Sequence, residues 1–372
     1  MLLNHSRIYC NDNLINIKIP FTEEMKKFFK DGNFSLISDP LKSKETAIIG
    51  MFILRPGKDT WSDPIILEDS SLSIYDVEHW IYNIDGLSGG GIIANGNVMD
   101  GYRLAMQYAI TDAVIIGSST IINDGTPKDN GDPGYVWLPQ YCAEWPHLKA
   151  ADSEMLDRFR EQRKLMQELG YASKRDYPAQ IAVTKSGNKT TPDLLSASIF
   201  HEKLPDGSPI EAYIITSKTG SDKIRNRAAE FNLENRIDDI LIVLSQDNNP
   251  DDIDLKMLPG ILFKDYNIIL ANHDGGKKVL EAFCNAGIID QFNFTFARKP
   301  SLFDAVKNNS DIDSNTKKTV LHDFQTSCVD FFDTNNGSMP KNFPVAEIIV
   351  DKPDEAAVVV LDTRDIKSFK EL

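Results

Sequence analysis

Five short apolar runs recur along the middle of this 372-residue chain, and they constrain its fold more than any other feature. They are rich in Ile, Val and Ala, and no polar residues alternate within them, as is typical of strands covered on both faces. Segments with apolar residues at helical spacing lie between them. This alternation predicts an α/β fold with a mostly parallel sheet. The predicted strands cover 113–117, 181–184, 212–216, 240–244 and 267–270.

Four helices are predicted between or after these strands. The last of them covers 277–286, has an apolar stripe and ends before Gly287, and an earlier one ends at Gly170. Glycine is common at these positions because it readily adopts the left-handed conformation that closes a helix. The three other helices follow residues that favour the N-cap position: Asn97, Ser153 and Ser221.

Two further apolar runs near the C-terminus, 345–350 and 356–362, are separated by a short turn-like connector and predict an antiparallel hairpin. The first 76 residues contain short apolar runs broken by prolines and carry no clear periodicity. We therefore predict an N-terminal extension over 1–76, packed on a main α/β domain over 77–372. Inserts are expected near 126–150 and 301–340.

Composition excludes several classes of function. The chain has 55 acidic residues against 40 Lys plus Arg, a net charge of −15, which argues against nucleic acid or an anionic membrane as partner. Its four cysteines form no CxxC pair, so neither a disulfide framework nor a zinc site is indicated. No apolar run approaches the roughly 18 residues of a membrane helix, and no secretory signal is recognisable. The expected location is the cytoplasm.

In an open parallel sheet, ligands bind at the carboxyl ends of the strands, where helix N-termini present free N–H groups. The strongest candidate for a pyrophosphate site among these exits is Asp274-Gly275-Gly276-Lys277. Its two glycines let the backbone close around an anion, and a helix is predicted to begin beside it. A tight structural turn is the alternative interpretation. The exit Gly117-Ser118-Ser119-Thr120 has a glycine and hydroxyls that suit a phosphate or ribose, although such a cluster also caps turns. The remaining strand exits are Lys185-Ser186-Gly187, Ser217-Lys218-Thr219-Gly220 and Ser245-Gln246-Asp247.

Other chemistries have weaker signals. Gly86-Leu87-Ser88-Gly89-Gly90 matches the GxSxG pattern of serine hydrolases, but the glycine- and asparagine-rich sequence after Ser88 disfavours the helix that a nucleophile elbow requires. The six histidines show no metal-binding spacing, so we predict no metal site. His273, beside the glycine pair, is interpreted as structural.

Four ordered motifs resemble the reductase domain of riboflavin biosynthesis, the C-terminal half of the bacterial bifunctional deaminase-reductase. Tyr82-Asn83-Ile84-Asp85-Gly86 is similar to the family's Ser-hydrophobic-Asp-Gly segment, and 111–120 to its Ala-Asp-Ala segment with the following Gly-x-x-Thr. Asp274-Gly275-Gly276 stands where the family has Glu-Gly-Gly, and 286–292 resembles its Ala-Gly-Leu-Val-Asp-Glu-Leu.

This resemblance implies a three-layer dihydrofolate-reductase-like fold, a homodimer, and NADPH-dependent reduction of the ribose carbon of a phosphoribosylaminopyrimidine. By the same resemblance, Asn83 and Asp85 face a small heterocyclic substrate, with Asp85 positioning it, and Arg103 is a further substrate candidate. The implied cofactor contacts are Gly117, Ser118, Ser119, Thr120, Asp274, Gly275, Gly276 and Lys277, with Ser186 and Thr216 as weaker candidates from their strand-end positions.

The chain also departs from the family pattern. Leu87 stands where the family has Lys, Tyr108 stands where it has Arg, and 122–125 replaces its Ala-Asp-Asp-Pro segment. Basic side chains grip substrate phosphates, so two alternatives stay open: a divergent reductase with another substrate, or a non-catalytic nucleotide-binding protein. A serine hydrolase that uses Ser88 is the third.

Overall fold

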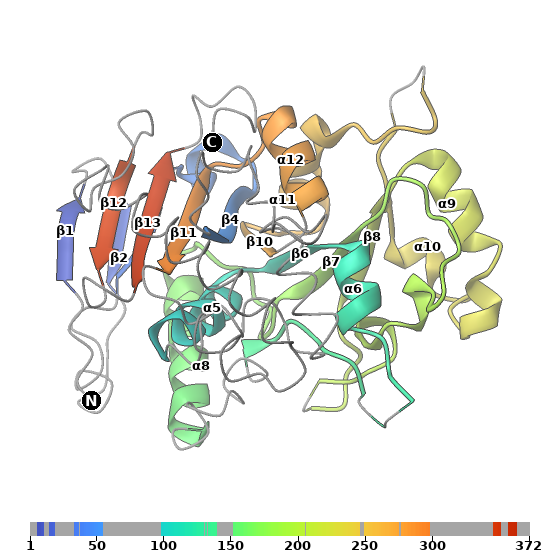
Figure 1. The fold of residues 1–372 in the computed structure, drawn as a ribbon, viewed down its shortest axis with the longest axis horizontal. Coiled ribbons are helices and arrows are strands. Elements are labelled where there is room, and N and C mark those ends of the chain that lie inside the picture. The colour runs from blue at the N-terminus through green and yellow to red at the C-terminus, as the bar shows by residue number, and fades with distance from the viewer. Residues whose placement is uncertain are drawn as a thin grey trace, which may run out of the picture.

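A ten-stranded sheet organises the protein, as the computed structural model shows in Figure 1. The structure describes residues 6–10, 15–18, 33–36, 38–54, 98–129, 131, 133–139, 152–204, 206–245, 249–274, 277–297, 345–350 and 356–362. The order across the sheet is β1 (Ser6–Cys10), β12 (Val345–Val350), β13 (Ala356–Asp362), β11 (Gln291–Ala297), β4 (Ala47–Leu54), β10 (Leu270–Asp274), β6 (Ala113–Gly117), β7 (Ala179–Val183), β8 (Ala212–Thr216) and β9 (Leu241–Val243). A separate antiparallel pair is formed by β2 (Ile15–Lys18) and β3 (Asn33–Leu36).

The larger part of the sheet is parallel. Every neighbouring pair from β11 through β4, β10, β6, β7 and β8 to β9 runs in the same direction. Antiparallel pairing is confined to β13, β12 and β1, and β12 and β13 form the predicted C-terminal hairpin. The predicted fold class, a mostly parallel α/β sheet with a C-terminal antiparallel hairpin, is therefore confirmed.

Helices cover both faces of the sheet, which makes three layers (Figure 1). One core packs sheet residues such as Val114 and Ile116 against α5 (Val98–Ile110), α6 (Ser118–Asp124) and α8 (Asp152–Glu168). The other packs alternate residues such as Ala113 and Ile115 against α11 (Leu258–Asp265) and α12 (Lys277–Ala286). Side chains of successive strand residues point to opposite faces, so each buried strand contributes to both cores. The other helices are α2 (Pro40–Ser43), α9 (Lys218–Arg225) and α10 (Ile237–Ile240), with 3-10 turns η2 (Leu194–Ser196), η3 (Ser198–Phe200), η4 (Ala228–Phe231) and η5 (Leu255–Met257).

Two strands from the predicted N-terminal extension belong to the main sheet. β4 lies between β10 and β11, and β1 forms the sheet edge beside β12. The start of β4 is anchored by a hydrogen bond from the Oγ1 of Thr46 to the carbonyl of Ile268 (2.6 Å) and one from the N–H of Ala47 to the carbonyl of Ile269 (3.0 Å). The sheet thus draws on residues from both sides of the predicted boundary at residue 76.

Several predicted boundaries differ from the structure. The strand expected over 240–244 is shorter, because Ile240 ends α10 and β9 covers only Leu241–Val243. The strand expected over 267–270 begins only at Leu270, since Asn267 has a left-handed backbone (φ 50°) that no strand tolerates. Two predicted N-caps are wrong: α8 already includes Ser153, and Ser217 caps α9 in place of Ser221. Gly170 and Gly287 do adopt the expected left-handed conformation (φ 82° and 68°).

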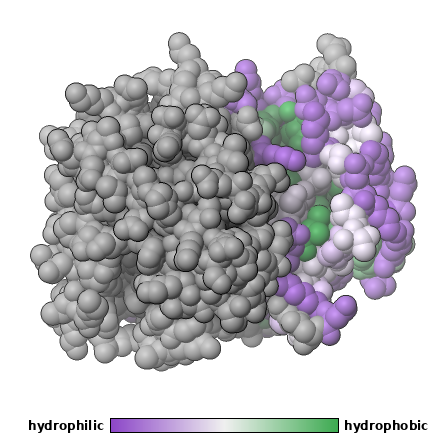
Figure 2. All heavy atoms as spheres, in the orientation of Figure 1, coloured by the Kyte–Doolittle hydropathy of each residue, from purple (hydrophilic) through white to green (hydrophobic). Residues whose placement is uncertain are grey.

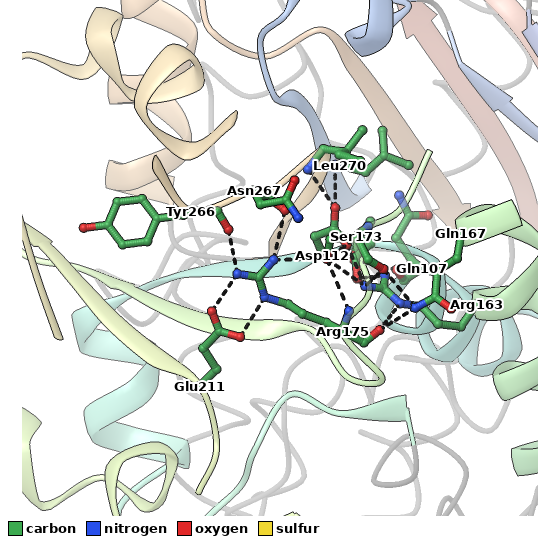
Figure 3. Close-up of polar contacts among 12 residues, drawn as sticks. Gln107, Asp112, Arg163, Gln167, Ser173, Arg175, Glu211, Tyr266, Asn267 and Leu270 are labelled. Atoms are coloured by element: carbon green, nitrogen blue, oxygen red, sulfur yellow. Dashed lines mark hydrogen bonds and ion pairs between the residues drawn. The ribbon is translucent and has the colours of Figure 1, made fainter. Parts of the chain in front are cut away.

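A buried polar network ties together the amino ends of the central strands (Figure 3). The carboxylate of Asp112, just before β6, accepts hydrogen bonds from Arg163 of α8, from both the N–H and the hydroxyl of Ser173, and from the N–H of Ile269. Beside it, Arg175 forms a bidentate ion pair with Glu211. Because the charges of Asp112 and Arg163 are paired and hydrogen-bonded, they are tolerated inside the protein, whereas the Arg175–Glu211 pair is partly exposed.

The described surface carries few exposed apolar side chains. Hydrophilic residues cover most of the described part of the face in Figure 2, and the large exposed apolar residues of the described ranges are Leu169, Val243 and Met257. Within the part of the chain that the structure describes, we find no helix with the length and hydrophobicity needed to cross a bilayer.

Candidate functional site

The exits of β6 and β10 lie side by side at the carboxyl edge of the sheet. The two strands are parallel neighbours, with Ala271 beside Ala113 and His273 beside Ile115. β10 therefore ends at Asp274 next to the end of β6, from which α6 starts at Ser118. Strand pairing thus brings Asp274 close to the end of β6 and the start of α6, which the sequence analysis also selected for the cofactor.

The first backbone N–H groups of α6 have no hydrogen-bond partner among the described residues. Its N-cap is Gly117 (φ −66°, ψ 139°), which has no side chain to cap the helix. No described residue accepts a hydrogen bond from the N–H groups of Ser118, Ser119 or Thr120. Ser119 is exposed, and Ser118 and Thr120 are half-buried. Free N–H groups with adjacent hydroxyls at a helix start suit an anionic group such as a phosphate.

The exits of β7 and β8, in contrast, are closed by protein groups. At the start of α9, the side chain of Ser217 accepts from Gly220, while the N–H of Lys218 donates to the hydroxyl of Ser245 and that of Thr219 to the carbonyl of Pro250. Ser217 also donates its hydroxyl to the carbonyl of Lys185 on the neighbouring loop. These backbone donors are therefore already used within the protein.

Two weaker cofactor candidates lie at this closed junction. Ser186 is exposed and accepts a long hydrogen bond from the N–H of Asn188 (3.4 Å). Thr216 is completely buried, and its Oγ1 lies where a side chain on Gly220 would be. The structure does not bring Ser186 and Thr216 to the β6–β10 exit.

A cluster of two carboxyl groups and a phenol marks the β6–β10 exit. The hydroxyl of Tyr108, on α5, donates to Oδ2 of Asp274. Asp124, the last residue of α6, is half-buried, and its Oδ1 is buried without a hydrogen-bond partner. Burial is the main cause that raises the pKa of Asp124 to about 7; Lys128 opposes this rise and the Asp274 carboxylate adds to it. A carboxyl group with a pKa near neutrality can exchange protons at physiological pH.

The backbone around Asp124 is fixed by the chain that follows it. The carbonyl of Asp124 accepts from the N–H of Tyr135 (2.8 Å). Two residues later, the backbone of Trp137 is held by the buried side chain of Gln180, which accepts from its N–H and donates to its carbonyl (both 2.9 Å). Tyr135 and Trp137 of the predicted insert are thus tied to the end of α6 and to β7.

The strand that leads to this site carries two unusual buried residues. Neither polar atom of the Asn272 side chain and neither ring nitrogen of His273 has a hydrogen-bond partner. His273 packs against Phe283 of α12 (ring centroids 5.0 Å apart), and its complete burial lowers its pKa to about 4. It is therefore neutral at physiological pH, in agreement with a structural role.

Some predicted site residues cannot be placed. Arg103 and Lys277 lie in α5 and α12, and only their backbone is described. The others lie outside the described residues: Asn83, Asp85, Ser88, Gly275 and Gly276. Within the described ranges, no three His, Cys, Asp or Glu side chains are arranged to hold a metal ion.

The sequence pattern does not indicate Tyr108 and Asp124 as site residues. Tyr108 stands where the resembled family has an arginine, and Asp124 lies in the segment that replaces the family's Ala-Asp-Asp-Pro. The available signal was positional: Asp124 lies one helical turn beyond Thr120, and Tyr108 is on the helix that enters β6. Neither position has a motif that indicates an interaction with Asp274.

No family model and no curated protein matches this chain. Solved structures with a similar arrangement include a pyrimidine reductase-like protein from Corynebacterium diphtheriae, with 16% identity and a TM-score of 0.43 over 87% of this chain and 94% of that one. RibD from Acinetobacter baumannii is 14% identical (TM-score 0.38, 87% of this chain and 60% of that chain). The riboflavin biosynthesis reductase Rib7 from Saccharomyces cerevisiae is 10% identical (TM-score 0.36, 86% and 90%). These similarities are weak, and the chemistry proposed below depends on this chain's own residues.

Proposed function

We propose that this chain is an NADPH-dependent reductase that reduces the ribose carbon of a phosphoribosylaminopyrimidine, or a related carbonyl of a heterocyclic compound. The proposal is carried by one observation: the uncapped start of α6 lies beside the Asp274 exit of β10, on adjacent parallel strands. In open parallel sheets, ligand sites form at such exits. The carboxyl cluster at the same place supplies groups that can hold or donate a proton.

The residues at the start of α6 fit a cofactor phosphate. Gly117 has no side chain at the N-cap, and the N–H groups and hydroxyls of 118–120 are the donors that an anion requires. When bound, NADPH supplies the hydride. The protein's contribution is to fix the acceptor carbon near the nicotinamide and to exclude water, so no covalent nucleophile is required.

Calorimetric titration of NADPH into the purified full-length chain tests this proposal. The decisive variant is Ser119→Asp, which adds a negative charge at the start of α6, where an acidic residue also favours the helix. We expect NADPH affinity to fall by about tenfold or more, which corresponds to about 1.4 kcal/mol. Ser186→Asp is the matched control, because it places the same charge on the exposed loop of the closed β7 exit. Absence of NADPH binding to the folded protein, or equal binding by the Ser119→Asp variant, contradicts the proposal.

Turnover separates the reductase from a non-catalytic nucleotide-binding protein. The second interpretation is favoured by Tyr108, which stands in place of a basic residue and is engaged with Asp274. Oxidation of NADPH in the presence of the ribosylaminopyrimidine supports the reductase. Binding without turnover across pyrimidines, pterins and simple carbonyl compounds supports the alternative. We also propose a homodimer, as the resemblance implies; light scattering of the full-length chain tests it.

A further inference from the structure

Three polar side chains from three separate segments interact near the end of β10, two through a hydrogen bond and the third through charge. Asp274 ends β10, Tyr108 lies on α5, and Asp124 ends α6. The Tyr108 side chain is only 1% exposed and donates its hydroxyl proton to Asp274. Asp124 and Asp274 are both half-buried, and Oδ1 of Asp124 is itself buried.

The two carboxyl groups have different surroundings. Asp274 receives a hydrogen bond from a phenol, and such a bond stabilises the ionised carboxylate. Asp124 has a buried oxygen with no donor to satisfy it, which disfavours its ionised form. When two carboxyl groups lie close together, the proton belongs to the group whose neutral form is better accommodated. This asymmetry places the proton on Asp124.

The charged groups around Asp124 do not reverse this assignment. Lys128, in the loop after α6, favours ionisation of Asp124, whereas Asp274 on β10 opposes it. Burial outweighs the lysine, and the pKa of Asp124 rises to about 7. Asp124 therefore carries a proton in a substantial fraction of molecules at neutral pH.

We propose that Asp124 is the proton donor of the reduction, and that Tyr108 is a positioning residue that keeps Asp274 ionised and so leaves the proton on Asp124. This inference rests on the proposed function. In a phosphoribosylaminopyrimidine the acceptor carbon takes the hydride that NADPH supplies, its bond to the ring oxygen breaks, and the electron pair of that bond moves onto the oxygen. In a carbonyl substrate it is the π electron pair of the C=O bond that moves onto the oxygen. That oxygen takes the proton from Asp124, which gives an alcohol, NADP⁺ and the Asp124 carboxylate. Asp124 then recovers a proton from water.

The first test measures protonation directly and needs no cofactor or substrate. Carboxyl carbons of the full-length protein are labelled and followed by NMR as the pH changes. We expect one aspartate to titrate near pH 7 and its signal to disappear in Asp124→Asn. Asp206→Asn changes an exposed aspartate in a surface turn and is expected to leave that titration intact. An Asp124 that titrates near its ordinary pKa of about 4 overturns the inference.

The second test examines the role of Tyr108. Tyr108→Phe keeps the packed ring but removes the donor to Asp274, so Asp274 competes for the proton. We expect the neutral fraction of Asp124 at about pH 6 to fall in this variant. An unchanged Asp124 titration in Tyr108→Phe overturns the positioning role.

The third test measures whether the rate of reduction depends on the proton of Asp124. Asp124→Asn is expected to lower kcat/KM by about 100-fold or more, the usual contribution of a general acid, and to remove the alkaline fall of activity near pH 7. Asp124→Glu is expected to restore part of the rate. NADPH affinity, measured by calorimetry, is expected to stay equal or to increase in Asp124→Asn. If NADPH does not bind the wild-type chain, the proposed function fails; if NADPH binds but Asp124→Asn retains the rate and pH profile, only the proton-donor inference fails.

Discussion

The Nη2 atom of Arg163 lies 2.6 Å from Oδ1 of Asp112, and the two side chains are only 4% and 0% exposed. Arg163 comes from the middle of α8, and Asp112 is the residue before β6. The same carboxylate also accepts from the N–H of Ser173 (2.8 Å) and the N–H of Ile269 (2.7 Å). One buried carboxylate thus joins a helix, a loop and the approaches to two central strands.

Asp112→Asn is expected to destabilise the protein by about 3–5 kcal/mol, because Arg163 is left buried without a counter-charge. Urea unfolding followed by circular dichroism measures this loss. The matched control is Asp157→Asn, which breaks an exposed ion pair with Arg160 (3.0 Å) on the same helix. This control is expected to change the free energy of unfolding by less than about 1 kcal/mol. Equal losses in the two variants contradict the role assigned to Asp112.

Asp124→Asn is expected to change how stability depends on pH. The pKa of Asp124 is raised from 3.8 to about 7 in the folded protein, mainly by burial. The stability that its proton provides is therefore fully present below about pH 4 and is lost as the pH rises to about 7. At about pH 8 we expect Asp124→Asn to be more stable than the wild type by about 1–3 kcal/mol, and this advantage to disappear at about pH 4. Urea unfolding at both pH values gives the comparison, and a variant less stable at pH 8 refutes it.

His273→Leu is expected to make the free energy of unfolding depend less on pH between about pH 4 and pH 6.5. Complete burial lowers the pKa of His273 from 6.5 to about 4, so between these values the unfolded chain binds more protons than the folded one. Wild-type stability therefore falls as the pH drops from about 6.5 to about 4, by about 2–3 kcal/mol from this residue. The leucine variant lacks that loss. If the free energy of unfolding changes equally with pH in the two proteins over this range, His273 is not buried in its neutral form.

Gly187→Ala is expected to be strongly destabilising. Gly187 has φ 57°, and a Cβ atom there would lie 2.3 Å from the carbonyl oxygen of Gly220. We expect a loss of about 2–4 kcal/mol from left-handed strain and backbone displacement together. Gly207→Ala is the control: φ is 85°, but no atom lies within 4 Å of the added Cβ. It is expected to lose only about 1 kcal/mol, the conformational part. Thermal unfolding of both variants measures the two losses of stability, and their difference is the cost of the close contact with Gly220.

Local patterns predicted the elements whose structure depends on near neighbours. The strand 113–117 has the predicted bounds, and so do the hairpin strands 345–350 and 356–362. In the hairpin, a short connector brings two apolar runs together, so sequence and pairing agree. The helix over 277–286 was also correct, because its apolar stripe and closing glycine are local signals.

Strands whose place in the sheet depends on residues far away in the sequence could not be predicted from local patterns. The run 47–54 is the longest clean apolar stretch of the chain, yet its role follows from pairing with β10 and β11 more than two hundred residues later. β10 itself reads Leu-Ala-Asn-His-Asp, which is unlike a buried strand. Only burial between β4 and β6 makes it one. For the same reason, the cluster of Tyr108, Asp124 and Asp274 has no sequence signature.

The position of β4 determines which shortened versions of this protein can remain intact. A fragment that starts at residue 77 removes the strand between β10 and β11 and leaves both with unpaired backbone edges. The fragment loses the hydrogen bonds to Ile268 and Ile269 that precede β10. Trimming for crystallisation or domain fusion must therefore retain 46–54, even though this segment is remote in sequence from every residue of the proposed site.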